Sequence, residues 1–371
     1  MRATPLLLGL SLSAPLAACG PAQIEVDPSK VVDVHVAPAS QQLLFCPGDA
    51  FLVEVVAKLD DGTSCSTHDP ARGCMGKSNA LLDVGRVHLE GTNGVPGNEP
   101  LIWVPDGDPL KTAGTGLALK AWITGEHGGK SMEGDASLKP VYDCKMDVMY
   151  GGGIATGNPG APGPNLTIAI TPISTPYYAD AALVRVEFPG QRVYLISPSA
   201  DRPVKITTRG QDGMPGPQGP SGVDGKPGAD TATPAAACSK GGEGTPGTDG
   251  GAGGPGGDGG PGGTITVLLD DKAADKLRGR VLLTSNGGAA GPGGKGGWGG
   301  KGGPGGKGSQ PGPDCMDNTG PAGKSGANGA DGAAGKAGAP GPAPTYENKP
   351  REALFGTELA AIQAIEATKA H

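Results

Sequence analysis

The residues best suited to chemistry in this 371-residue chain are its cysteines and histidines. Cys65, His68 and Cys74 lie close together in the sequence, and thiolate and imidazole are ligands that Zn²⁺ prefers. Their spacing is not that of a standard structural zinc site, and a fourth ligand is missing. A loop disulfide between Cys65 and Cys74 is therefore the favoured interpretation, and we expect no metal site.

The other cysteines also fit disulfides better than catalysis. The chain has seven cysteines, and setting Cys19 aside leaves an even number, which indicates disulfides in an oxidising compartment. With Cys65 and Cys74 paired, we expect Cys46 to pair with Cys144 across the first domain. Cys238 and Cys315 lie in corresponding short segments between glycine-rich runs, and we expect them to pair with each other.

No combination of side chains predicts catalysis or a bound cofactor. The five histidines do not cluster, and His35, in an alternating stretch, is expected to be a solvent-facing strand residue. Asp–Gly pairs at Asp249 and Asp258 are similar to those of calcium-binding glycine repeats, but the nine-residue period of such repeats is absent. No serine and histidine order suggests a triad, and no Gly-x-Gly-x-x-Gly match opens a helix after a strand. We expect a protein that is not an enzyme.

The amino-terminal residues indicate export. Arg2 precedes an apolar stretch, Pro5–Ala18, which is typical of a secretory signal peptide and too short to span a bilayer as a helix. The stretch ends Leu16-Ala17-Ala18-Cys19, which resembles the lipobox of bacterial lipoproteins. The resemblance implies cleavage before Cys19 and lipid on its thiol, a stable anchor when several acyl chains insert. Gly20, in place of aspartate, implies sorting to the outer membrane or cell surface.

Composition limits the fold and the partners. The chain holds 70 Gly and 37 Pro, and only 4% of its residues are aromatic, so a single large apolar core is excluded for much of it. The formal net charge of −7 gives no electrostatic support for binding nucleic acid. The expected partners are the membrane, through Cys19, and a surface glycan or another matrix component.

Two regions show the period-2 apolar pattern of strands. From Val31 to Cys144, short strands separated by turns predict a β-sandwich, with an immunoglobulin-like topology as one option. A second set of strands follows a glycine-rich link, Gly151–Pro164, and its last strand leads directly into glycine repeats. We expect those strands at Leu166–Ile170, Leu183–Phe188, Arg192–Ile196 and Val204–Thr207.

Glycine then recurs at every third residue in four runs, which we number 1 to 4. Run 1 extends from Gly210 to Gly228, run 2 from Gly241 to Gly262, run 3 from Gly287 to Gly306, and run 4 from Gly320 to Gly341. Runs 1 and 4 are Gly-X-Y, whereas run 3 and most of run 2 are Gly-Gly-X. The pattern resembles the collagen-like repeats of bacterial surface proteins and covers about a third of the chain.

A period of three predicts polyproline-II-type helices, and two assemblies are open. Three chains could share a collagen axis as a homotrimer, or the four runs could form an intrachain polyglycine-II bundle whose backbone groups bond between helices. Connectivity favours the bundle and a monomer. Run 1 leaves a β head, turns at Cys238 and returns as run 2; run 3 leaves again, turns at Cys315 and returns as run 4.

The chain is thus expected to be mostly β with polyproline-II or polyglycine-II helices. Residues 264–284 are expected to form strand, short helical turn and strand, and Thr357 to cap a carboxyl-terminal helix that docks on the β head. Trp298 is expected to pack on the bundle surface. The expected parts are a signal peptide (1–18), a lipidated tether (19–30), a β-sandwich (31–145), a second β region (146–209), the glycine-rich region (210–343) and a carboxyl-terminal segment (344–371).

These features favour a membrane-anchored surface lipoprotein with a structural, spacer or adhesive role, because rods with little apolar surface suit display better than catalysis. The alternative is a specific binding module that recognises carbohydrate or ice with one repetitive face of the bundle.

Overall fold

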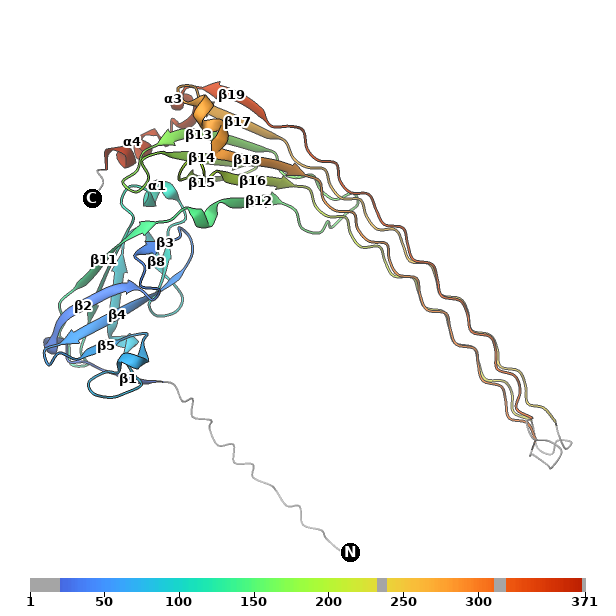
Figure 1. Ribbon diagram of the computed structural model, residues 1–371. Coiled ribbons are helices and arrows are strands. Elements are labelled where there is room, and N and C mark those ends of the chain that lie inside the picture. The colour runs from blue at the N-terminus through green and yellow to red at the C-terminus, as the bar shows by residue number, and fades with distance from the viewer. Residues whose placement is uncertain (1–20, 232–238, 310–317, 369–371) are drawn as a thin grey trace, which may run out of the picture. The chain divides into compact units, whose positions relative to one another are not determined.

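The computed structural model describes residues 21–231, 239–309 and 318–368 (Figure 1). The chain is mostly β, with several sheets and only short helices, as the sequence predicted. It divides into two compact units. Unit 1 comprises the chain up to Gly107 together with Gly116–Val141, and unit 2 comprises Asp108–Thr115 together with the chain from Tyr142 onward.

Unit 1 is built from short strands in three sheets. The strands are β1 (Ala22–Ile24), β2 (Val31–Pro38), β3 (Leu44–Phe45), β4 (Phe51–Leu59), β5 (Ser64–Ser66), β6 (Ala80–Leu82), β7 (Val87–Gly91), β8 (Gly94–Pro96), β9 (Ile102–Pro105), β10 (Leu117–Ile123) and β11 (Gly134–Pro140). Three 3₁₀ turns accompany them: η1 (Pro28–Lys30), η2 (Pro70–Arg72) and η3 (Val84–Arg86). The sheet orders are β3-β11-β10-β7, β2-β4-β9-β8 with β5 paired to β4, and β1-β6.

Alternation along these strands builds the core of unit 1. In β10, every second side chain from Leu117 to Ile123 is buried, as the period of two requires when one face of a strand meets the core. One apolar cluster joins residues from both larger sheets, among them Val53 and Val55 of β4 and Leu119 of β10. Two sheets sharing one core are consistent with the predicted β-sandwich, whereas its immunoglobulin-like topology stays a prediction.

The expected tether differs from the structure in one respect. Ala22–Ile24 forms β1, which pairs in parallel with β6, and Val26 is buried in the core of unit 1. The reason is that Ile24 and Val26 add apolar surface to that core. Residues 22–26 therefore belong to the folded unit.

Unit 2 holds the remaining elements. Its strands are β12 (Asp147–Gly151), β13 (Leu166–Ile173), β14 (Ala181–Phe188), β15 (Gln191–Ser197), β16 (Val204–Arg209), β17 (Ile265–Asp270), β18 (Val281–Asn286) and β19 (Thr345–Lys349). Its helical elements are α1 (Pro109–Thr112), η4 (Asp143–Lys145), α2 (Ala274–Leu277), η5 (Arg278–Arg280), α3 (Arg351–Phe355) and α4 (Leu359–Ala367). The sheet orders are β12-β16-β18 and β15-β14-β13-β17-β19.

The two sheets of unit 2 sort the strands by their relation to the glycine-rich segments. The strands β12, β16 and β18 are mutually parallel, and each of them leads into such a segment. The strands β13, β17 and β19 are also mutually parallel, and each of them receives one. One apolar cluster contains residues of both sheets, including Ile206 of β16 and Val267 of β17. Figure 1 shows the four runs side by side, extending from the ends of these strands.

The carboxyl-terminal helix is present, but its predicted cap is wrong. Helix α4 begins after Glu358, and no side chain caps its first turn by a hydrogen bond. Glu358 occupies the N-cap position instead of Thr357, because its carboxylate is held by basic residues of the sheet. Ile362 and Ile365 are buried in a cluster with residues of β13 to β15, so the helix packs on the β head of unit 2 as predicted.

Candidate functional site: the hydrogen-bonded glycine runs

The four runs bond to one another along their described length. Glycine N–H groups of run 1 donate to carbonyls of run 3, at 2.8 Å from Gly216 to Pro292 and 2.7 Å from Gly222 to Trp298. The two residue numbers rise together from pair to pair, so runs 1 and 3 are parallel. Runs 2 and 4 are parallel by the same criterion, as in the 2.9 Å bond from Gly250 to Ala327.

The remaining bonds join runs of opposite direction. Run 2 donates to run 1 (Gly254 to Pro217, 2.8 Å), run 3 donates to run 2 (Gly297 to Gly251, 2.9 Å), and run 4 donates to run 3 (Gly332 to Gly294, 2.8 Å). Among the four runs, runs 2 and 3 therefore each bond to the three others, whereas the described bonds of runs 1 and 4 to other runs go to runs 2 and 3. Runs 2 and 3 are the inner pair, and runs 1 and 4 are the outer pair.

This arrangement explains why the repeat differs between runs. A Cβ added at Gly296 of run 3 would lie 1.9 Å from the Gly329 oxygen of run 4, and one added at Gly297 would lie 1.9 Å from the Pro220 oxygen of run 1. An inner run thus has two positions of each triplet facing neighbours, and both are glycine in most triplets, with Thr245 and Thr248 of run 2 among the exceptions. An outer run needs one, as at Gly332, whose Cβ would lie 1.9 Å from the Gly254 oxygen. Gly-Gly-X marks the inner runs and Gly-X-Y the outer ones.

The sequences of runs 1 and 2 are also matched residue by residue. At two positions where a backbone N–H of run 1 points toward run 2, run 2 carries threonine: the Thr248 hydroxyl accepts from Val223 at 2.8 Å, and that of Thr245 accepts from Lys226. Where run 1 has Pro217 or Pro220, which lack a donor, run 2 has a glycine that the proline ring covers. The pairing satisfies donors that a glycine would leave to solvent.

Carboxylates match runs 1 and 3 in the same way. Asp224 accepts from the Lys301 N–H at 2.7 Å, and Asp230 accepts from the Lys307 N–H at 2.7 Å. Pro215 and Pro227 of run 1 lie at the same offset from Pro292 and Pro304 of run 3, where no donor needs an acceptor. This offset of 77 residues between aspartate and N–H, and between proline and proline, is the sequence signal that would have predicted the register.

The aspartates considered for calcium have a structural role. Asp249 and Asp258 of run 2 accept from the backbone N–H groups of Ala327 and Lys336 of run 4, each at 2.7 Å. These carboxylates therefore bind neighbouring backbone. Asp331 accepts from Lys295 at 2.7 Å, which lowers the pKa of its carboxyl and raises the pKa of the lysine.

The glycine-rich link Gly151–Pro164 belongs to the same assembly. The Ala155 N–H donates to the Asp212 oxygen of run 1, and the Gly163 N–H donates to the Pro261 oxygen of run 2, both at 2.8 Å. The link leaves β12 and enters β13. Runs 1 and 2 together leave β16 and enter β17 in the same way, and runs 3 and 4 leave β18 and enter β19, so the link is a shorter third copy of this arrangement. From the sequence this segment was predicted only to be a link, since its period of three is limited to Gly157, Gly160 and Gly163.

Trp298 lies on the outside of run 3. Its side chain is 69% exposed, although its backbone carbonyl accepts from run 1. The expectation that it packs on the bundle surface is right about its place, but most of the ring faces solvent. His35 is exposed on β2 as predicted.

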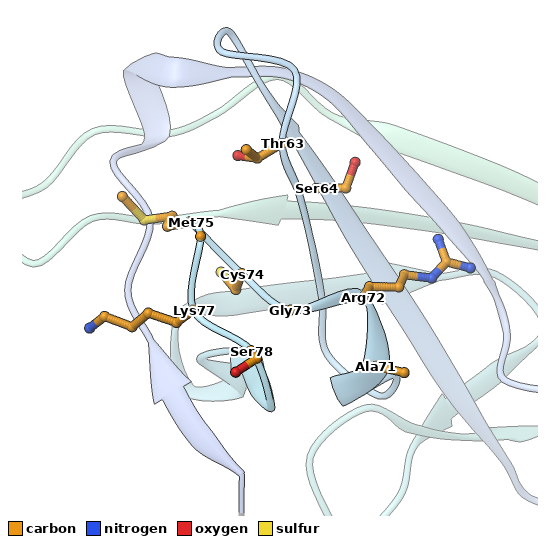
Figure 2. A pocket seen from close by; sticks show the side chains of 10 residues that line it. Thr63, Ser64, Ala71, Arg72, Gly73, Cys74, Met75, Lys77 and Ser78 are labelled. Atoms are coloured by element: carbon orange, nitrogen blue, oxygen red, sulfur yellow. The ribbon is translucent and has the colours of Figure 1, made fainter.

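The Cys65–Cys74 disulfide is present and closes the loop that contains η2. A pocket of about 370 Å³ lies beside it, lined by Thr63, Ser64, Ala71, Arg72, Gly73, Cys74, Met75, Gly76, Lys77 and Ser78. Figure 2 shows the Arg72 and Lys77 side chains pointing away from each other. Because polar groups that bind one ligand must converge, this loop is not a candidate active site.

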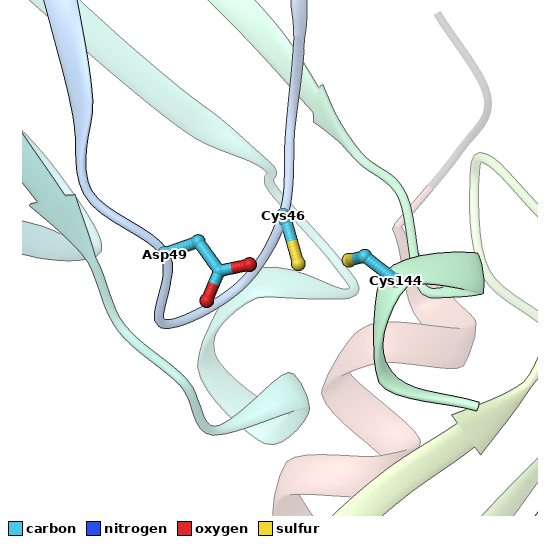
Figure 3. A group of neighbouring side chains, drawn as sticks. All are labelled: Cys46, Asp49 and Cys144. Carbon is cyan, nitrogen blue, oxygen red and sulfur yellow. The ribbon is translucent and has the colours of Figure 1, made fainter. Parts of the chain in front are cut away.

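Cys46 and Cys144 are each disulfide-bonded. Figure 3 draws them with Asp49, and a disulfide sulfur is not a thiolate, so these cysteines do not form a metal centre. The predicted lipidation residue, Cys19, and the predicted tip pair, Cys238 and Cys315, lie outside the described residues.

A charge network around a buried carboxylate holds the start of α4 against a sheet of unit 2. The Glu358 carboxylate, 6% exposed, accepts from Tyr194 at 2.7 Å and forms ion pairs with Arg185 at 3.2 Å and Arg192 at 2.7 Å. Burial by itself raises the pKa of Glu358, but hydrogen bonds from Tyr194 and Thr357 and the two arginine charges outweigh it, so the pKa is lowered. The ionised carboxylate thus ties α4 to β14 and β15.

Comparisons with known proteins give no match: no family model matches the chain, and neither a curated protein nor a solved structure matches it significantly. Within the part of the chain that the structure describes, no helix combines the length and apolar character needed to cross a membrane.

Proposed function

We propose that the protein is a lipid-anchored surface lipoprotein in which four glycine runs form a stiff, projecting rod with a spacer or adhesive role. The observation that carries this proposal is the network of backbone hydrogen bonds between runs 1 to 4 of a single chain. Such a network gives a long element its own rigidity without an apolar core. In the proposed fold, each run is a polyproline-II-type helix of a polyglycine-II bundle.

Three features support one chain over a collagen-like trimer. The bonds join runs of opposite direction, whereas collagen chains are parallel. Glycine content follows the number of neighbours within the chain, as the inner and outer runs show. Donors and acceptors are matched between particular runs, as in Thr248 with Val223. At about 3.1 Å per residue, each run would extend roughly 60–70 Å.

The anchor is proposed from the lipobox-like residues before Cys19 and is tested separately. In a bacterium that processes lipoproteins, the wild type should be acyl-labelled and sediment with membranes, and Cys19→Ala should do neither. A Cys46→Ala variant is the control for losing a cysteine. Continued acyl labelling of the Cys19→Ala chain would exclude the anchor.

The proposed rod is tested by deleting, from all four runs, the segments that lie side by side at one height along the bundle. Hydrogen bonds align residues 219–224, 247–252, 296–301 and 326–331. Removing these four segments together should shorten the rod by about 19 Å and leave it folded, because every remaining triplet keeps its partners. Removing only 219–224 and 247–252 should expose unpaired glycine in runs 3 and 4. X-ray scattering would measure the length; an unfolded product of the matched deletion would refute the bundle.

A further inference from the structure

The inner runs carry two outward rows of side chains, which we call the run-3 ridge and the run-2 ridge. Each ridge consists of the third residue of every triplet in its run, including the few triplets that have only one glycine. The run-3 ridge is Ala289, Pro292, Lys295, Trp298, Lys301, Pro304 and Lys307. The run-2 ridge is Glu243, Pro246, Asp249, Ala252, Pro255, Asp258 and Pro261.

The ridges lie on different sides of the inner pair. In run 3, the first glycine of a triplet faces run 4 and the second faces run 1, so the third residue points outward. In run 2, Gly250 faces run 3 and Gly251 faces Pro220 of run 1, so the third residue lies on the side of run 4, where the carboxylates of Asp249 and Asp258 accept from backbone N–H groups. The side chains of the two ridges therefore do not meet within one molecule.

The ridges have opposite charges. The charged residues of the run-3 ridge are all lysines, and those of the run-2 ridge are all acidic. Lys301, Lys307, Glu243 and Asp249 are exposed. The outer runs add charges at the base of each ridge: Asp224, Asp230 and Asp331 beside run 3, and Lys324 and Lys336 beside run 2. The three aspartates already accept from backbone N–H groups of run 3, and Asp331 also pairs with Lys295, which leaves Lys301 and Lys307 as the ridge lysines for a contact between molecules.

The opposite charges also lie at the same height along the rod. The bond from Gly300 to Thr248 aligns the triplet of Lys301 with that of Asp249, and the bond from Gly306 to Gly242 aligns the triplets of Lys307 and Glu243. The bond from Gly297 to Gly251 places Trp298 at the level of Ala252. A second molecule standing parallel, at the same height, would present carboxylates opposite both lysines and a small side chain opposite the exposed indole.

We infer that parallel copies of this protein associate side by side through the run-3 ridge of one copy and the run-2 ridge of the next. The contact uses different surfaces on the two partners, so it can repeat from copy to copy instead of closing as a symmetric dimer. Exposed ion pairs contribute only about 0.2–1 kcal/mol each, and burying part of Trp298 adds to them. The association is therefore weak in solution and becomes effective when the copies are confined in one orientation on a surface. The inference adds self-association to the proposed surface role and does not depend on the lipid.

Tethering the full chain by an amino-terminal histidine tag to vesicles with nickel-chelating lipid imposes that orientation without Cys19. Resonance energy transfer between copies that carry donor and acceptor fluorophores should exceed the transfer expected for copies distributed at random on the vesicle. The excess should fall as salt screens the charges. Two charge-reversed chains provide the specific test. One is Lys301→Glu with Lys307→Glu, and the other is Glu243→Lys with Asp249→Lys.

Each reversed chain has like charges on its two ridges, so each alone should show at least fivefold less excess energy transfer than the wild type. An equal mixture should restore it, because each chain then meets a partner of opposite charge. Circular dichroism of each reversed chain, compared with the wild type, is the control for folding. Excess transfer in either reversed chain alone, or none in the mixture, would overturn the inference, whereas failure of the Cys19 anchor would leave this result unchanged.

Discussion

Unit 2 contains two regions that are stabilised in different ways. In the β head, the side chains of Ile168, Val184 and Val267 are wholly buried, and apolar burial supplies the stabilisation. In the runs, the buried atoms are mostly glycine backbone, and bonds such as Gly297 to Gly251 hold the segments together. The first region needs side chains of the right volume, and the second needs their absence. Mutations should therefore act by opposite rules in the two regions.

The largest expected effect is that of adding a side chain between runs. In Gly297→Val, the new Cβ would lie 1.9 Å from the Pro220 oxygen, so runs 1 and 3 must separate locally. Losing about five bonds of roughly 1 kcal/mol each would destabilise the rod by about 5 kcal/mol. Hydrogen exchange of the run amides measures this. Gly279→Ala is the control, since an added Cβ there meets nothing within 4 Å; equal protection in both variants would contradict the packing.

Removing a core side chain should have the next largest effect. Ile168→Ala leaves a cavity among the strands of the β head and should lower the free energy of unfolding by about 3 kcal/mol. Chemical denaturation measures it. Leu282→Ala on β18 is the matched control, because that side chain is 55% exposed and should change stability little. A larger loss from Leu282→Ala would show that the assigned faces of the sheet are wrong.

The ion network around Glu358 should make the stability of the head depend on pH. The folded state lowers the pKa of Glu358 below its ordinary value of 4.5, so its stabilisation is complete above that value and is lost as the pH falls through the folded-state pKa. Thermal unfolding between pH 7 and pH 3 should show a smaller acid-induced decrease in Glu358→Gln than in the wild type. Replacing the exposed Glu352 by Gln should leave the decrease unchanged. Equal decreases in all three proteins would argue against an ionised Glu358.

The smallest expected effect tests the matching of runs 1 and 2. Thr248→Val keeps the size of the side chain but removes the hydroxyl that accepts from the Val223 N–H. The cost should be about 1 kcal/mol, seen as faster exchange of the Val223 amide. Thr248→Ser retains the acceptor and should behave as the wild type. If the serine variant exchanges as fast as the valine variant, the hydroxyl does not protect that amide.

The sequence by itself determined most local structure. Apolar stretches between turn signals located β13 to β18. The close spacing of Cys65 and Cys74 predicted their bond. The period of three located the runs, and the step from Gly-X-Y to Gly-Gly-X indicated that some runs have more neighbours than others.

Only the tertiary structure decided which runs are inner and in what register they lie. A period of three fits any shift by one triplet, and the contacts that select one register join residues about 77 positions apart, as Asp224 and Lys301 do. The same long-range pairing assigned the Gly151–Pro164 link to the assembly and placed Lys301 level with Asp249 on opposite ridges. It also decided that Glu358, and not Thr357, stands at the N-cap of α4, because the buried Arg185 and the exposed Arg192 of distant strands both pair with the Glu358 carboxylate.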